Sequence, residues 1–223
     1  MKATAPHAHG VTRHVEALRE VGGEAFVVRM SRGNLNFEPG QYLAVGIEGQ
    51  IDAREYSIYS SPEQEYLEIL VKEVEEGYVS PRLHALHAGQ RLFVDGPFGY
   101  FTIPEEQRTA GKFLFVATGT GISPFHCFAL AYPQLDYRIL HGVRRLEDRY
   151  EMDVFDRSRY TACVTRQDGG DYRGRVTDYL REHPVDPDTL CYLCGNCDMI
   201  YEAFDILKDQ GVSPEHLFAE VYF

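Results

Sequence analysis

The stretch Lys112-Phe-Leu-Phe-Val-Ala-Thr-Gly-Thr-Gly-Ile-Ser-Pro124 decides the fold of the second half of the chain. Residues 112–117 form an apolar, β-rich run, and a glycine turn then leads into a segment with helical character at 123–131. Small residues at such a turn let the backbone N–H groups of a helix start approach a phosphate. We therefore expect a strand, a phosphate-binding turn and a helix, in that order.

The alternation of strand and helix continues toward the C-terminus. The further expected strands cover 137–143, 160–165, 190–194 and 216–223, and the further expected helices cover 146–155, 176–183 and 198–208. Strands that alternate with helices are typical of a doubly wound parallel α/β sheet. We therefore predict that residues 109–223 form a Rossmann-like α/β domain.

The first half of the chain has a different period. Short β-rich runs at 25–30, 42–47, 66–74 and 91–94 are separated by Gly- and Pro-containing turns. One helix is expected over 80–86, with Ser80 as its N-cap and Pro81 at its first position. This pattern predicts that residues 1–108 form an antiparallel six-stranded β-barrel.

Composition limits the partners. The formal net charge of -12 argues against nucleic acid or an anionic membrane, because the long-range field repels both. No apolar run reaches the roughly 20 residues that span a bilayer, so no membrane insertion is expected. Residues 1–10 are polar and lack the apolar centre of a signal peptide, so we expect a cytoplasmic protein.

Five cysteines are an odd number, which disfavours a complete disulfide framework. Three of them form the run Cys191-x-x-Cys194-x-x-Cys197, whose spacing is that of iron–sulfur ligands. The run has no fourth cysteine nearby, and cysteine also serves as a small apolar residue in a buried strand. We expect the strand and no metal site, with the cluster as the alternative.

Arginines follow two of the expected strands. A carboxylate after the second strand commonly binds the ribose of NAD, whereas an arginine there suits the 2′-phosphate of NADP. This chain has Arg144 after the second strand, and Thr165, Arg166 and Arg175 after the third. The pattern favours NADP. The alternatives are a solvated basic face and a tight turn at Gly119 that binds no ligand.

Five short motifs run along nearly the whole chain. They are Arg54-x-Tyr56-Ser57, Gly77-Tyr78-Val79-Ser80, Gly96-Pro97-Phe98-Gly99, Gly119-Thr120-Gly121-Ile122-Ser123-Pro124 and Cys194-Gly195-x-x-x-Met199. Together, and in this order, they resemble the motifs of the ferredoxin/flavodoxin–NADP reductase family, whose members bind FAD in the first domain and NADP in the second. The resemblance implies that residues 1–108 bind FAD and residues 109–223 bind NADP.

For FAD, the resemblance implies that Arg54 neutralises the pyrophosphate with help from the backbone of 78–80. It also places the Tyr56 ring on one flavin face, the Ser57 hydroxyl near flavin N5 and Thr120 between the two cofactors. The implied FAD-binding residues are Arg54, Glu55, Tyr56, Ser57, Ile69, Val71, Gly77, Tyr78, Val79, Ser80, Thr120, Tyr222 and Phe223.

For NADP, the implied residues are Thr118, Gly119, Gly121, Arg144, Thr165, Arg166, Arg175, Cys194, Gly195 and Met199. The implied catalytic residues are Ser57, Cys194, Glu220 and Tyr222. Plant-type members end in Glu-x-Tyr, with the ring over the second flavin face, and Glu220 and Tyr222 match that ending. Phe223 resembles the extra aromatic of bacterial members. The alternative is that Tyr222 and Phe223 only pack an edge strand.

The function that the resemblance implies is an FAD-dependent oxidoreductase of the ferredoxin–NADP(+) reductase type. It would transfer hydride between NADPH and FAD and pass single electrons to ferredoxin or flavodoxin as a separate chain. One alternative is an NAD(P)H-dependent reductase component of an oxygenase, or a free-flavin reductase. Another is a non-catalytic, flavin-binding electron-transfer subunit.

Overall fold

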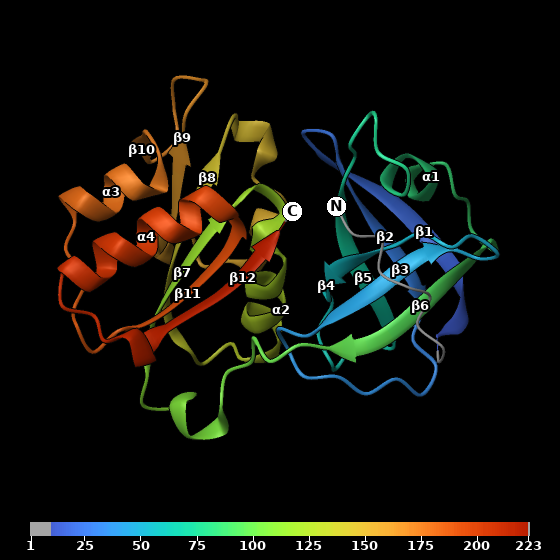
Figure 1. Cartoon of the computed structure of the whole chain (residues 1–223), viewed down its shortest axis with the longest axis horizontal. Helices are drawn as coiled ribbons and strands as arrows, with labels where there is room; N and C mark the ends of the chain where they lie inside the picture. The colour runs from blue at the N-terminus through green and yellow to red at the C-terminus, as the bar shows by residue number, and fades with distance from the viewer. Residues whose placement is uncertain (1–9, 223) are drawn as a thin grey trace. The chain divides into compact units, whose positions relative to one another are not determined.

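The computed structural model describes residues 10–222 of the 223-residue chain. The predicted role of Phe223 therefore lies outside the described residues. The chain divides into two compact units, of which unit 1 ends at Thr102 and unit 2 begins at Ile103 (Figure 1). Each unit has its own sheet.

Unit 1 is an antiparallel sheet of six strands in the order β4-β3-β6-β1-β2-β5. A bridge between Ile58, just after β4, and Ile69 of β5 joins the two ends of this order, so the sheet closes into the predicted barrel. The strands are β1 (Val11–Gly22), β2 (Ala25–Ser31), β3 (Tyr42–Ile47), β4 (Ala53–Ser57), β5 (Tyr66–Lys72) and β6 (Arg91–Phe98).

The one α-helix within residues 10–102, α1 (Ser80–His84), is shorter than expected, and Ser80 is not its N-cap. Val79 holds the cap position, and the Ser80 hydroxyl instead accepts a hydrogen bond from the Val74 backbone N–H at 3.0 Å. The prediction of a Ser80 cap was therefore wrong, because this side chain ties the preceding turn to the end of β5.

Unit 2 is a parallel sheet of six strands in the order β10-β9-β8-β7-β11-β12. The strands are β7 (Lys112–Thr118), β8 (Asp136–Val143), β9 (Tyr160–Val164), β10 (Tyr172–Arg173), β11 (Leu190–Asn196) and β12 (Leu217–Tyr222). The helices are α2 (Ser123–Ala131), α3 (Val176–Glu182) and α4 (Cys197–Asp209).

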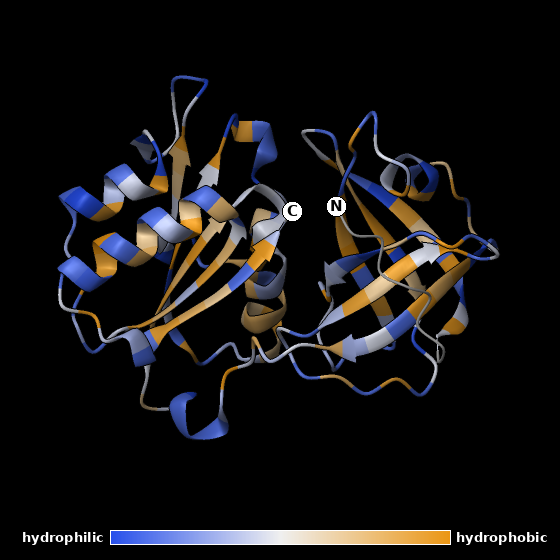
Figure 2. Ribbon diagram, viewed as in Figure 1, coloured by the Kyte–Doolittle hydropathy of each residue, from blue (hydrophilic) through white to orange (hydrophobic). Residues whose placement is uncertain are grey.

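Helices cover both faces of this sheet, which confirms the doubly wound prediction. Phe115 of β7 stacks on Phe125 of α2 with ring centroids 4.8 Å apart. Its neighbours Leu114 and Val116 point to the opposite face, where they share a core with α3 and α4. Figure 2 shows that the strands are mainly hydrophobic, whereas α3 and α4 carry both hydrophilic and hydrophobic residues.

The helix expected over 146–155 does not form. Two short 3₁₀ turns, η3 (Leu146–Asp148) and η4 (Met152–Val154), take its place. Glu151 between them has a left-handed backbone with φ of 42°, which ends any regular helix. The remaining 3₁₀ turns are η1 (Glu105–Gln107), η2 (Gly119–Ile122), η5 (Arg157–Arg159) and η6 (Pro214–His216).

Among residues 10–222, none of the helices is both long and apolar enough to cross a membrane.

His84 of α1 holds the helix to the barrel through two carboxylates. Its Nε2 lies 2.6 Å from Glu20 Oε1, and its Nδ1 lies 2.6 Å from Glu73 Oε2. A carboxylate can only accept, so both ring nitrogens donate and the imidazole carries a positive charge. The hydrogen bond with Glu20 raises the pKa of His84, burial opposes this shift, and Glu73 raises the pKa further.

This arrangement predicts a stability contribution that depends on pH. It is complete below the unfolded pKa of about 6.5 and is lost as the pH rises through the higher folded pKa. His84→Gln should lower the free energy of unfolding by about 1 kcal/mol near pH 6 and by less near pH 9. Urea unfolding at both pH values measures the difference, with exposed His14→Gln as the control. A loss that is the same at both pH values contradicts the charged pair.

Candidate functional site

The candidate site of unit 2 lies where the strand order reverses. The chain runs from β7 through β8 and β9 and then returns to β11 on the other side of β7. Ligands of open α/β sheets bind at the carboxyl ends of the strands next to such a reversal. Here the carboxyl end of β7 continues into η2, and the carboxyl end of β11 carries Cys194 and Gly195. The fold therefore brings two distant motifs to one place.

Two glycines let these motifs contact each other. A Cβ on Gly121 would lie 2.3 Å from the Cys194 carbonyl oxygen, and a Cβ on Gly195 would lie 2.3 Å from Thr118 Oγ1 and 2.8 Å from its carbonyl oxygen. Gly195 also has φ of 127°, a conformation that other residues rarely adopt. The Thr118 hydroxyl accepts a hydrogen bond from the Asn196 N–H at 2.9 Å. The loop and β11 are thus held in direct backbone contact.

Arg144 and Arg166 are neighbours at the carboxyl ends of β8 and β9. The Arg166 N–H donates to the Arg144 carbonyl at 2.9 Å, and the Thr165 N–H donates to the Val143 carbonyl at 3.2 Å. Arg175 follows β10 and precedes α3. All three arginine side chains are exposed, and within residues 10–222 none of them forms an ion pair.

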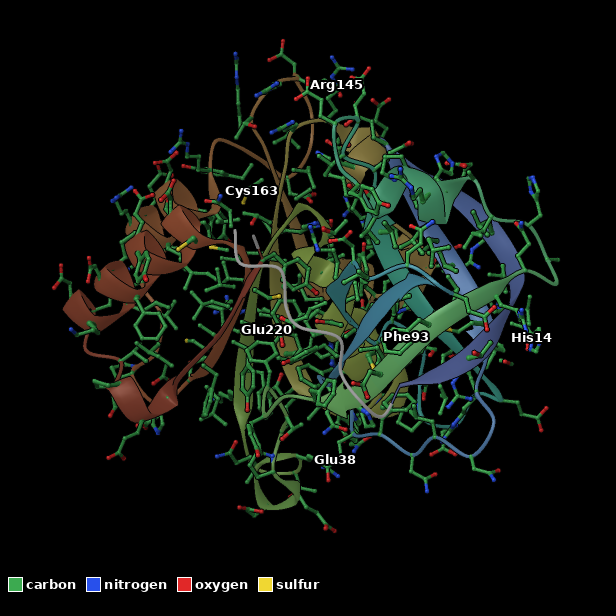
Figure 3. All side chains as sticks on the ribbon, turned by 45° about the vertical axis from the view of Figure 1, so that its right-hand side comes forward. His14, Glu38, Phe93, Arg145, Cys163 and Glu220 are labelled. Carbon is green, nitrogen blue, oxygen red and sulfur yellow. The ribbon has the colours of Figure 1, made fainter. Side chains whose placement is uncertain are left out.

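Other arginines of the same unit do have carboxylate partners. Arg157 pairs with Asp171 at 3.0 Å, and Arg173 pairs with Asp168 at 3.1 Å. Arg145, which Figure 3 labels, lies 3.5 Å from Glu147. Arg144, Arg166 and Arg175 have no such carboxylate among the described residues, and a phosphate is the kind of anion that exposed arginines of this sort bind.

Cys194, Glu220 and Tyr222 come together at the ends of β11 and β12. Cys194 is paired in register with Glu220, and its sulfur lies 4.0 Å from Glu220 Oε2 (Glu220 is labelled in Figure 3). Burial, followed by the Glu220 carboxylate, raises the pKa of the Cys194 thiol well above its usual value, and a hydrogen bond with Tyr222 opposes this shift. Cys194 is thus a neutral thiol, which does not act as a nucleophile.

Met199, one of the predicted NADP residues, belongs to the hydrophobic core. It lies in the first turn of α4, is 7% exposed and packs within the cluster beneath α3 and α4. Its backbone N–H donates to Asn196 Oδ1, which caps the helix. In this structure Met199 supports the start of α4 beside the candidate site.

In unit 1, Arg54, Tyr56 and Ser57 lie on β4. The half-buried Arg54 donates to the carbonyl of Ala53 at 2.8 Å and forms no ion pair with any described residue. Burial raises the pKa of Tyr56, and the positive charge of Arg54 lowers it. Ser57 is buried, whereas Glu55 is exposed.

The turn at 77–80 is built around a close approach. The Gly77 N–H donates to the Val74 carbonyl at 2.7 Å, and a Cβ on Gly77 would lie 2.8 Å from that oxygen. Tyr78 is 45% exposed, with the Arg82 guanidinium 3.7 Å from its ring centroid. Val79 is buried. The turn therefore has a defined backbone and one accessible aromatic ring.

Ile69 and Val71 of β5 were predicted to bind FAD. Both side chains are fully buried in the barrel core. Their backbones pair with β2, so neither residue exposes a surface to a ligand in this structure.

The residues present fit two phosphate-bearing cofactors. In unit 1, Arg54 has no counter-ion among the described residues, and the turn before α1 supplies backbone N–H groups. In unit 2, a Cβ on Gly119 would meet nothing within 4 Å, so the space beside the glycine loop is open, and three free arginines lie at the neighbouring strand ends. These donors suit the pyrophosphate of FAD and the phosphates of a nicotinamide dinucleotide.

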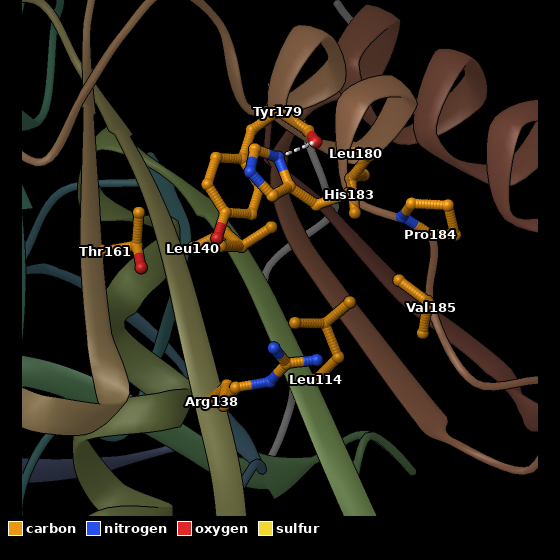
Figure 4. Close-up of a pocket in the computed structure, with 9 residues that line it drawn as sticks. All are labelled: Leu114, Arg138, Leu140, Thr161, Tyr179, Leu180, His183, Pro184 and Val185. Atoms are coloured by element: carbon orange, nitrogen blue, oxygen red, sulfur yellow. Dashed lines mark hydrogen bonds between the residues drawn. The ribbon is translucent and has the colours of Figure 1, made fainter.

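A small cavity elsewhere in unit 2 does not coincide with these residues. Its volume is about 40 Å³, and it lies between the sheet and α3 (Figure 4). Leu114, Arg138 and Thr161 line it from the amino-terminal halves of β7, β8 and β9. Because ligands of such sheets bind at the carboxyl ends, this cavity is not the candidate cofactor site.

The run Cys191-x-x-Cys194-x-x-Cys197 does not form a set of ligands. Cys191 and Cys194 are three residues apart on β11, so their side chains point to opposite faces of the sheet. Cys197 begins α4. The strand interpretation accounts for the buried positions of the first two cysteines.

Comparison with known proteins agrees with this geometry. A family described as an oxidoreductase FAD-binding domain matches residues 13–103, and one described as an oxidoreductase NAD-binding domain matches residues 115–204. Ferredoxin--NADP reductase B of Sorangium cellulosum is 31% identical over 212 residues, which cover 83% of this chain and 85% of that protein.

Other similar proteins belong to oxygenase systems. The toluate 1,2-dioxygenase electron transfer component of Pseudomonas putida is 25% identical over 230 residues, which cover 96% of this chain and 68% of that protein. The chain spans only 56–63% of five further reductase and electron-transfer components that it matches.

A solved structure shares the fold. The ferredoxin NADP+ reductase of Neisseria gonorrhoeae, with bound FAD and NADP, superposes with a TM-score of 0.85 over 97% of this chain and 100% of that chain. At 18% identity, this likeness shows the fold alone.

These matches define the class of protein: an oxidoreductase with one FAD-binding and one NAD-binding domain. Within that class, the chain belongs to the ferredoxin–NADP reductase family. The predicted fold and the predicted use of FAD with a nicotinamide dinucleotide are thereby confirmed.

The contact between the loop and β11 predicts different costs for two glycine substitutions. Gly195→Ala should lower the free energy of unfolding of unit 2 by about 2–5 kcal/mol, because it adds a backbone clash to a strained φ. Gly211→Ala is the matched control, since Gly211 has φ of 94° but its nearest neighbour would be 3.6 Å away. It should cost about 1–2 kcal/mol. Thermal unfolding followed by circular dichroism compares them, and equal losses contradict the close contact.

Proposed function

We propose that this protein is an FAD-dependent NADPH reductase of the ferredoxin–NADP(+) reductase type, which passes electrons to a ferredoxin or flavodoxin on a separate chain. The observation that carries this proposal is a set of three exposed arginines, which follow β8, β9 and β10 on the sheet edge that also carries the glycine loop and which have no carboxylate partner among residues 10–222. An NADP 2′-phosphate is a dianion that needs such partners, whereas the ribose hydroxyl of NAD calls for an acceptor.

The proposed division of labour follows the two halves of the chain. Residues 1–108 bind FAD and residues 109–223 bind NADP. Arg54 and the turn at 77–80 hold the FAD pyrophosphate, and Tyr56 and Ser57 face the flavin. Thr118, Gly119 and Gly121 hold the nicotinamide dinucleotide.

The charged and terminal residues complete the NADP site in this proposal. Arg144, Arg166 and Arg175 bind the 2′-phosphate, with Thr165 beside them. Cys194, Glu220 and Tyr222 border the nicotinamide. The 4.0 Å separation of Cys194 Sγ and Glu220 Oε2 supports their grouping.

The cofactors supply the redox chemistry: FAD accepts two electrons as hydride and releases them one at a time. What the chain itself supplies is position and charge. The neutral Cys194 thiol and the Glu220 carboxylate beside it form a polar wall without a nucleophile. Arg54 and the three arginines provide the counter-charge to the phosphates.

A specific observation favours a second candidate. The toluate 1,2-dioxygenase electron transfer component of Pseudomonas putida matches 96% of this chain, whereas ferredoxin--NADP reductase B of Sorangium cellulosum matches 83%. The chain could therefore serve as the NAD(P)H-dependent reductase component of an oxygenase. Both candidates use the same cofactor sites and differ in the protein that receives the electrons.

The purified chain should contain non-covalent FAD and should reduce a dye such as ferricyanide with NADPH. Acid extraction followed by chromatography identifies the flavin, and steady-state absorbance measures the turnover. Addition of a purified ferredoxin, a flavodoxin or an oxygenase component then separates the two candidates. FMN as the sole flavin contradicts the cofactor assignment, and FAD without NADPH turnover favours a non-catalytic electron-transfer subunit.

The arginine set predicts the cofactor preference. Arg166→Ala should lower kcat/KM for NADPH by about 10- to 100-fold and change NADH turnover little, because a charged hydrogen bond contributes about 1.5–3 kcal/mol. Arg173→Ala is the control, since Arg173 lies in the same region but pairs with Asp168. It should change neither value by more than about twofold. Equal losses with both cofactors in the Arg166 variant contradict a 2′-phosphate contact.

A further inference from the structure

A buried histidine holds the glycine loop from beneath. His141 of β8 is completely buried, and its Nε2 lies 2.8 Å from the Gly119 carbonyl oxygen. Its Nδ1 lies 2.7 Å from the Tyr160 hydroxyl of β9. The side chain therefore connects the first residue of the loop with two neighbouring strands.

The partners fix which nitrogen carries the proton. A carbonyl oxygen only accepts, so the Nε2 of His141 donates to Gly119. The Nδ1 then accepts from the Tyr160 hydroxyl, and the ring is neutral. Burial lowers the pKa of His141 to about 4, a shift that the Gly119 carbonyl and Asp148 oppose and Arg149 increases. This hydrogen-bonded arrangement therefore persists throughout the neutral pH range.

The position of the Gly119 carbonyl also determines the direction of the next N–H. In a planar trans peptide the C=O and N–H bonds point in opposite directions. By holding the Gly119 carbonyl toward the sheet, His141 directs the Thr120 N–H away from it. The Ser123 hydroxyl fixes the next peptide in a similar way. It donates to the Thr120 carbonyl at 2.7 Å, so the Gly121 N–H points in the opposite direction, away from Ser123.

Both of these N–H groups belong to the first turn of η2, where backbone donors have no partner within the helix. They are the donors that an anionic ligand at this loop would meet.

We propose that His141, held by Tyr160, is a positioning residue for dinucleotide binding: it orients the loop so that the Thr120 N–H faces the phosphates of the dinucleotide. This inference rests on the proposed function, since it assumes that the loop binds the nicotinamide dinucleotide. It predicts an effect on the affinity for that ligand and little effect on the reaction once the ligand is bound.

Two substitutions separate the two hydrogen bonds of the ring. The side-chain nitrogen of Gln is as many bonds from Cα as the Nε2 of His. His141→Gln therefore retains a donor for Gly119 and loses the partner of Tyr160. The amide oxygen and nitrogen of Asn are as many bonds from Cα as the Nδ1 of His. His141→Asn therefore retains a partner for Tyr160 and loses the donor to Gly119. Each variant leaves one buried group without its partner, so the two should have similar stabilities.

The experiment is a titration of the FAD-loaded wild-type protein and both variants with NADP+, followed by the flavin difference spectrum. His141→Asn should raise Kd by about 3- to 10-fold, as expected for one lost neutral hydrogen bond. His141→Gln should stay within about twofold, and kcat at saturating NADPH should change little in either variant. Melting temperature and FAD content of each variant are measured beside the titration.

Equal Kd values for the two variants, or losses of affinity that follow melting temperature alone, overturn the inference and leave His141 as a packing residue. A wild-type protein that binds no nicotinamide dinucleotide overturns the proposed function instead. The two failures are therefore distinguishable.

A second measurement needs no variant. Nitrogen-15 NMR of the wild-type histidines should show His141 as a neutral ring with hydrogen on Nε2 from about pH 8 down to about pH 6. Hydrogen on Nδ1, or a protonated ring near pH 6, overturns the inference even if both variants fail to fold.

Discussion

The backbone contact between the glycine loop and the end of β11 is the constraint on which the rest of unit 2 depends. Gly121 packs against Cys194, and Gly195 packs against Thr118, at distances that leave no room for a side chain. This contact fixes where α2 starts, and thereby the face of the sheet that its phenylalanines cover. It also sets the position of Cys194 relative to β12, which carries Glu220 and Tyr222.

Charge in this protein is arranged locally, and its net value says little about the sites. The chain carries a formal charge of -12, yet most arginines are occupied by neighbours. In the barrel, Arg19 and Arg29 share one oxygen of the buried Glu68, at 3.0 and 2.9 Å. Arg32 donates to backbone carbonyls of two loops. By contrast, the exposed Arg144, Arg166 and Arg175 form no ion pair with any residue of 10–222, which leaves their charges available to an external anion.

Much of the fold could be predicted because apolar runs with strand periodicity mark buried strands directly. The helix over 123–131 and the strand over 42–47 have the predicted bounds. By contrast, β1 (Val11–Gly22) escaped notice, because most of its residues are polar or exposed and its pairing contains register shifts. Its place in the barrel comes from backbone pairing, which the residue pattern does not reveal.

The segment 146–155 shows why a helix predicted from local sequence can fail to form. Its residues favour a helix, but Asp148 hydrogen-bonds the Arg145 N–H and Glu151 adopts a left-handed backbone. The buried rings of Tyr150 and Phe155 pack against His141 and Tyr160 instead.

For the candidate site, the glycines and arginines were visible as motifs. The pairing of His141 with Tyr160 was not, because 19 residues separate them and only the adjacency of β8 and β9 brings them together.

The two sheets differ in their edge strands, which are the places where a further strand could pair with a sheet. The bridge between Ile58 and Ile69 joins the outermost strands of the barrel, so these two borders meet each other. The sheet of unit 2 ends on one side with β10, which has only two residues and carries a highly exposed, charged Arg173. Short length and charge both discourage strand-to-strand aggregation. The β10 border of unit 2 is thus poorly suited to strand-to-strand association.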